Sequence, residues 1–127
     1  MAKISINSKI KGALSDEVIT SVSAIKNNNT ITFNDNGTMV KIIFLESSIN
    51  IIRENKDLRL SLLFEEGKNL ESEYLIKELN SSMKVTTITK KLLLSEKKIS
   101  IEYDLYINDE YSDNFIYHLE WSWEKWI

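Results

Sequence analysis

The residue with the clearest capacity for acid–base chemistry is His118, the only histidine in the chain. An imidazole titrates near neutral pH and can act as a general base when a carboxylate orients it. Glu102 and Asp104 lie on a neighbouring segment, at the same sequence parity as His118. A three-residue loop between the two segments would set Glu102 opposite His118, and a longer loop would set Asp104 there.

We favour a simpler interpretation, in which these side chains form a charge pair on a solvated strand face. A cross-strand pair of this kind contributes roughly 0.2–1 kcal/mol. The chain contains no Gly-x-Ser-x-Gly sequence that would supply a nucleophile. We therefore predict no catalytic residues and no enzymatic activity.

Metal and nucleotide sites also lack their usual patterns. Glu120 could join these side chains around a hard cation, but the run 109–113 lacks the glycine and the terminal glutamate of a calcium loop. The chain has no cysteine, which excludes disulfides and cysteine metal sites. Its three glycines, Gly12, Gly37 and Gly67, are too far apart to form a phosphate-binding loop. We predict neither a metal nor a cofactor.

Ligand binding has better candidates. Arg53 follows an apolar pair on a predicted strand, and an inward guanidinium could bind a carboxylate or phosphate through two hydrogen bonds. The alternative places Arg53 at a barrel rim, with its charged end in water. Aromatic side chains of one parity would either fill the interior or line a pocket for one small apolar ligand. The predicted ligand-binding residues are Arg53, Tyr74, Tyr103, Tyr117 and Trp121.

The segments 99–107 and 115–123 must position most of these residues. In both segments apolar residues recur at every second position. Because side chains alternate between the two faces of a strand, each segment predicts a strand with one buried face. On this interpretation Tyr103 and Tyr117 point inward, whereas His118 points to solvent.

The same period of two recurs along most of the chain, for example in residues 4–10, 18–24 and 58–64. Clusters rich in Asn, Asp, Gly and Ser separate these runs, and such residues tolerate the backbone of tight hairpins. The absence of proline is compatible with long strands. The sequence therefore predicts one all-β domain over residues 1–127. We expect an antiparallel meander of about eight to ten strands that closes into a barrel and so removes its edges.

One segment conflicts with this pattern. Asn69–Leu79 is rich in strong helix formers, and Asn69 could cap a helix at its N-terminus. Local propensity leaves helix and strand open for this segment.

Several different short motifs follow one another along nearly the whole chain. They are Gly37-Thr38-Met39, Ile51-Ile52-Arg53, Phe64-Glu65-Glu66-Gly67, Tyr74, Val85-Thr86-Thr87 and Ile101-Glu102-Tyr103-Asp104-Leu105. Together they resemble the YwiB-like family of small bacterial proteins. The resemblance implies a lipocalin-like, or calycin, β-barrel without an established biochemical function, and it favours a strand at Asn69–Leu79. The chain departs from the family at Asn55, where a glycine is usual, and at residues 76–79, which replace a Thr-Pro-x-Gly turn.

Charge and hydropathy limit the partners and the compartment. The net charge is −3, and no segment collects a large block of Lys and Arg, so binding to nucleic acid or an anionic membrane is disfavoured. No run approaches the roughly 20 apolar residues of a membrane span. The first residues lack the unbroken apolar stretch of a signal peptide. We expect a cytoplasmic protein.

Two functional hypotheses remain. The first is a non-enzymatic module that takes a small apolar or amphipathic molecule into the barrel. The alternative is a protein-interaction or self-association module, for instance a homodimer, that uses the Trp-rich C-terminus. Its aromatic residues Trp121, Trp123 and Trp126 would serve an interface or close one barrel mouth.

Overall fold

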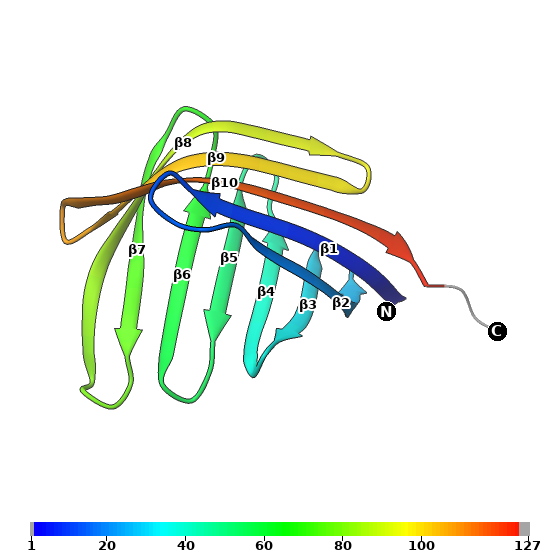
Figure 1. Ribbon diagram of the computed structural model, residues 1–127, viewed down its shortest axis with the longest axis horizontal. Coiled ribbons are helices and arrows are strands. Elements are labelled where there is room, and N and C mark those ends of the chain that lie inside the picture. Colours follow the sequence, from blue (N-terminus) through cyan, green and yellow to red (C-terminus); the bar gives the residue numbers. More distant parts are fainter. Residues whose placement is uncertain (1, 125–127) are drawn as a thin grey trace.

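The chain forms a closed antiparallel barrel. The computed structural model describes residues 2–124, and within them it contains ten strands and no helix. Each strand pairs with the next in sequence, and the last pairs with the first, which confirms the predicted all-β meander barrel (Figure 1). No helix that could cross a membrane occurs in this part of the chain. The strands are β1 (Ala2–Gly12), β2 (Val18–Asn27), β3 (Thr30–Asp35), β4 (Thr38–Phe44), β5 (Ile49–Glu54), β6 (Leu58–Phe64), β7 (Asn69–Ile76), β8 (Ser81–Ser95), β9 (Lys98–Ile107) and β10 (Glu110–Trp123).

The barrel is flattened into two layers. Strands β3 to β7 lie side by side in one layer, and β8, β9, β10 and β1 cross them in the other (Figure 1). β8 belongs to both layers, because it pairs with β7 up to Ile88 and with β9 from Val85 to Ser95. Its register with β9 shifts between Thr89 and Lys91. A bulge of this kind bends a strand, here at the point where β8 changes layer.

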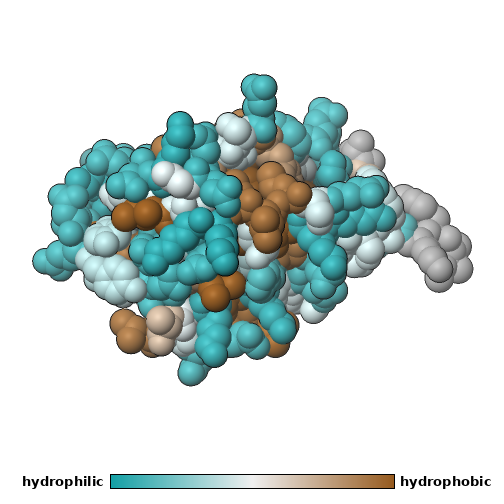
Figure 2. Space-filling model, turned by 90° about the horizontal axis from the view of Figure 1, so that it is seen from above, coloured by the Kyte–Doolittle hydropathy of each residue, from teal (hydrophilic) through white to brown (hydrophobic). Residues whose placement is uncertain are grey.

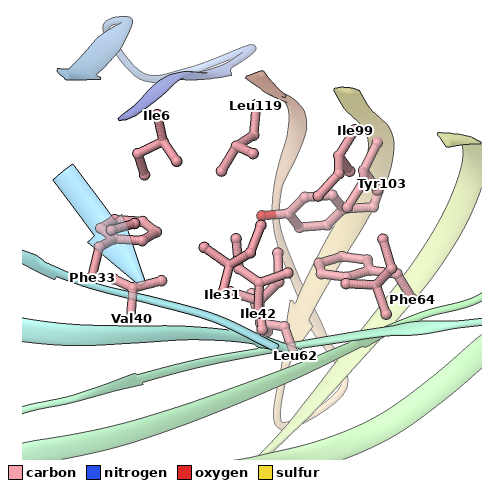
Figure 3. Packing of buried hydrophobic residues seen from close by; sticks show 14 of the residues in the cluster. Ile6, Ile31, Phe33, Val40, Ile42, Leu62, Phe64, Ile99, Tyr103 and Leu119 are labelled. Carbon is pink, nitrogen blue, oxygen red and sulfur yellow. The ribbon is translucent and has the colours of Figure 1, made fainter. Parts of the chain in front are cut away.

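The core lies between the two layers. Ile6, Leu119, Ile99 and Tyr103 face the side chains of the opposite layer (Figure 3). Burying one aliphatic side chain of this size contributes about 1.5–3 kcal/mol, so this layer of contacts is the main source of stability. The apolar side chains buried in the core are Ile4, Ile6, Ala24, Ile31, Phe33, Val40, Ile42, Ile49, Ile51, Leu62, Phe64, Val85, Ile99, Ile101, Tyr103 and Leu119.

The turns have the residues that their backbone requires. The residues other than glycine with a positive φ angle are Asn28, Asn36, Asn80, Asn108 and Asp109. Asn and Asp adopt this left-handed conformation more readily than other side chains, and all five lie in turn clusters predicted from the sequence. The hairpin positions were therefore predictable from turn chemistry.

The helix-prone segment Asn69–Leu79 contains a strand. β7 occupies Asn69–Ile76, and a turn follows it. All eight residues of β7 pair with β8, while Leu70 and Tyr74 are half-buried and the side chains of Glu71 and Glu73 face solvent. Pairing and the burial of one face override helix propensity here, because propensity differences are only a few tenths of a kcal/mol per residue.

A buried carboxylate fixes the loop between β1 and β2 to β10. Asp113 accepts hydrogen bonds from the backbone N–H of Leu14 at 3.2 Å and from the Ser15 hydroxyl at 3.0 Å. Burial alone would raise the pKa of Asp113, but these bonds and the one from the Asn114 N–H hold it below its ordinary value. Gly12 packs directly against this carboxylate, and a Cβ atom at Gly12 would overlap Asp113 Oδ2.

We expect Gly12→Ala to lower the free energy of unfolding by about 1–3 kcal/mol, the usual cost of overpacking. Urea denaturation followed by tryptophan fluorescence measures this loss. In the double variant with Asp113→Ala, the added methyl group no longer meets a carboxylate. The two losses should then sum to more than the loss in the double variant, whereas simple additivity would contradict the steric explanation.

Candidate functional site

Six strands line a small pocket in the barrel interior. It has a volume of about 50 Å³ and is lined by Ile10, Val40, Ile51, Arg53, Leu62, Phe64, Tyr103 and Tyr117. All of these side chains occupy inward positions of the strand alternation. The walls are apolar except for one guanidinium and two phenols. Three polar side chains therefore converge on an otherwise apolar pocket.

Arg53 links this pocket to the surface. It lies on β5 opposite Val40 of β4 and Leu60 of β6. Its Nη2 donates a hydrogen bond to Asp35 Oδ2 at 2.9 Å, and the two side chains are 42% and 20% exposed. The guanidinium is thus partly in water and partly against the pocket. Such a position combines the rim and the inward alternatives that the sequence left open.

Tyr103 and Tyr117 bring hydroxyl groups to the pocket. Tyr103 is buried between two aromatic rings, with centroid distances of 4.6 Å to Phe64 and 5.5 Å to Phe115. Figure 3 shows its hydroxyl pointing into the interior. Burial raises the pKa of Tyr103 well above its ordinary value and that of Tyr117 to about 12. At neutral pH both phenols are therefore uncharged and can donate or accept a hydrogen bond.

Two of the predicted ligand-binding residues do not line this pocket. Tyr74 is half-buried on β7 and packs against the core cluster. Trp121 faces a separate hollow of about 190 Å³, with Lys26 Nζ 5.6 Å from its ring centroid. It also meets Trp123 edge to face at 5.1 Å, while Trp126 lies outside the described residues. Parity predicted that Trp121 lies on the inner face, but it could not give the position of either residue along the barrel.

His118 lies on the outer face of the barrel, as predicted, and is exposed. The prediction that Glu102 or Asp104 lies opposite His118 is wrong, because His118 lies opposite Ser100 of β9 and Lys9 of β1. The β9–β10 turn is shorter than the loops considered, and the register shifts between Tyr111 and Asp113, so Glu102 and Asp104 lie further along the barrel.

The outer surface around His118 contains another hollow, which is larger than the two described above. Its volume is about 350 Å³, and its lining includes Lys9, Ile19, Ser100 and Glu120. Seen from above in Figure 2, the molecule is mostly hydrophilic, with apolar side chains gathered near the centre of this view. Within residues 2–124 no group of three or more His, Cys, Asp and Glu side chains is placed to hold a metal ion.

Asp35 is the functional candidate that sequence reasoning missed. It lies in the cluster Asn34–Gly37, which the sequence analysis treated only as a turn. The pattern Ile31, Phe33, Asp35 continues the inward parity of β3, and this parity is the signal that could have placed the carboxylate beside Arg53.

The chain matches known proteins at the level of family and fold. Residues 4–119 match the model of a family described as "Domain of unknown function (DUF1934)". The crystal structure of the ywiB protein from Bacillus subtilis is similar, with a TM-score of 0.65 and 15% sequence identity over 97% of this chain and 91% of that one. These matches confirm the resemblance to YwiB-like proteins. A comparison with curated proteins finds no match.

We expect Tyr117 to ionise near pH 12 in the folded protein, about two units above an unfolded tyrosine. Because the folded-state pKa is raised, the buried phenol stabilises the fold below about pH 10, and this stabilisation is lost as the pH rises towards 12. An absorbance titration of tyrosinate, with circular dichroism to follow folding, measures both effects. Tyr117→Phe should remove the ionisation near pH 12 and leave Tyr103, whose pKa is also raised by burial, to ionise at still higher pH.

Tyr106→Phe is the matched control, since Tyr106 meets Tyr111 edge to face and does not line the pocket. This variant should keep the ionisation near pH 12. Simultaneous ionisation of all five tyrosines near pH 10, with the fold intact, would contradict the buried position of Tyr117.

Proposed function

We propose a binding function for this chain, which belongs to the DUF1934 family of proteins with a domain of unknown function. In this proposal the protein is a non-enzymatic, lipocalin-like module that binds the acidic end of a small amphipathic molecule. The binding site is the pocket beside Arg53. The convergence of one guanidinium and two neutral phenols on an apolar pocket is the observation that carries the proposal.

The chemistry of the pocket favours an anion with an apolar body. A guanidinium binds a carboxylate or phosphate through charge-assisted hydrogen bonds, which are roughly twice as strong as neutral ones. The hydroxyls of Tyr103 and Tyr117 can add hydrogen bonds to the same group. The apolar walls, among them Ile10 and Phe64, suit the first carbon atoms attached to it.

The size of the pocket limits how much of the ligand enters. A volume of about 50 Å³ is well below the roughly 300–1,000 Å³ of pockets that enclose a whole drug-sized molecule. The packed core leaves little further room, so only part of the ligand can lie inside the barrel. We propose that the head group binds beside Arg53 while the rest of the molecule lies towards the surface.

Asp35 sets the cost of binding. Its carboxylate already forms an ion pair with Arg53, with Oδ2 at 2.9 Å from Arg53 Nη2. An incoming anion must share or displace this partner, so binding is in competition with an internal ion pair. The sole histidine lies on the outer face, away from the pocket, which favours binding over acid–base catalysis.

We expect octanoate and octyl phosphate to bind and octanol to bind more weakly, because only the first two carry an anionic group. Two-dimensional NMR of labelled protein should show amide shifts around Arg53 and Tyr117. Arg53→Met should weaken anion binding at least tenfold, since a hydrogen bond to a charged group contributes about 1.5–3 kcal/mol. Asp35→Asn should strengthen it, because the competing charge is removed.

Arg59→Met is the matched control. Arg59 is the other arginine of the chain, is similarly exposed, and pairs with Glu54 away from the pocket. The affinity of the Arg59→Met variant for both anions should equal that of the unmodified protein. Equal binding by the Arg53 and Arg59 variants, or no shifts with either anion, would refute the proposal.

A further inference from the structure

Strand β2 leaves a backbone edge open along most of its length. All of its residues from Val18 to Lys26 pair with β1, but only Ile25, Lys26 and Asn27 pair with β3. Among the described residues, no backbone hydrogen bond joins Val18–Ala24 to any strand other than β1. The barrel is thus closed at one end of β2 and open beside the rest of it.

The alternation of hydrogen bonds identifies the groups on this edge. Glu124 N donates to Lys3 O at 3.1 Å, so odd residues of β1 bond towards β10 and even ones towards β2. The β2 residues opposite these even positions are also even, from Val18 to Ala24. The N–H and C=O groups of Ile19, Ser21 and Ser23 therefore face away from β1, on the open edge.

This edge has none of the features that usually prevent strand addition. From Val18 to Ile25 it contains no charged residue and no proline, and its pairing with β1 has no bulge. Val18 and Ile19 are 56% and 62% exposed. An uncharged strand rich in β-branched residues, with free backbone groups, is a template for another strand.

The end of β8 provides a contrast within the same molecule. Beyond Ile88 it also loses its β7 partner. However, this part begins with Lys90 and Lys91, and the backbone N–H of Leu92 donates to Glu66 Oε1. Lysines and a side-chain acceptor protect that edge, whereas β2 has no equivalent protection.

We propose that Val18–Ala24 pairs antiparallel with the same segment of a second copy of this chain. Because Ile19, Ser21 and Ser23 carry the free groups, paired residues must both be odd-numbered. With Ser21 opposite its own copy, Ile19 lies opposite Ser23, and no like charges meet along the strand.

This self-complementarity is the reason to choose a second copy as the occupant. The free backbone groups of Ile19, Ser21 and Ser23 are placed symmetrically about Ser21, so an antiparallel copy of the same segment satisfies all of them. The pairing continues the layer of β8, β9, β10, β1 and β2 into its copy. It uses neither Arg53 nor the Trp-rich C-terminus, so it stands independently of the proposed ligand site.

Sedimentation velocity over a concentration series tests the pairing. The unmodified chain should shift from 14.8 kDa to twice that mass as its concentration rises to about 1 mM. Ser21→Pro should remain monomeric, because proline removes the central N–H donor, yet an edge strand tolerates it on its open side. Ser21→Ala keeps the N–H and should dimerise like the unmodified chain.

A further variant tests the open edge by another route and guards against misfolding. Ile19→Lys places a charge beside the edge and should also prevent pairing, with circular dichroism showing an intact barrel. A chain that stays monomeric throughout, or a dimer unaffected by Ser21→Pro and Ile19→Lys, would overturn the proposal.

Discussion

The closure of the sheet by β1 is the constraint on which the rest of the structure depends. This strand pairs with β10 from Ile4 to Gly12 and with β2 from Ala2 to Ile10. Without it the meander would expose backbone groups along both β2 and β10. The candidate site depends on the same contact, because Ile10 and Tyr117 lie opposite each other across the β1–β10 ladder. Closure at the chain ends therefore builds the pocket as well as the core.

A ten-stranded barrel of circular cross-section would enclose more space than side chains fill, since eight strands already give an interior just wide enough for packing. This chain avoids a large void by flattening, so that side chains of opposite layers meet directly (Figure 3). The interior is consequently a packed core, with a small remaining pocket where Arg53 and Tyr117 replace aliphatic side chains. Filling and binding compete for the same space, and here filling takes most of it.

Much of this architecture follows from residue order alone, because side-chain alternation and turn chemistry are local properties. They were sufficient for the strands, for the inward Tyr103 and for the outward His118. Strand register is not a local property. His118 lies opposite Ser100 because of one tight turn and one bulge, and side-chain alternation predicts neither. Position along the barrel is not local either, and so Trp121 shares a face with Tyr117 without sharing its pocket.

The flattening of the barrel also explains why two neighbouring strand pairs share few backbone hydrogen bonds. Strands that leave one layer for the other cannot stay paired along their whole length, and the β6–β7 and β2–β3 ladders each have three residue pairs. At β6 the unpaired carbonyls of Ser61 and Leu63 accept hydrogen bonds from the hydroxyls of Ser72 and Thr87. At β2 no such side chain bridges the opening in the described part of the chain. One seam is thus closed from within, and the other has backbone groups that only water or a further strand can satisfy.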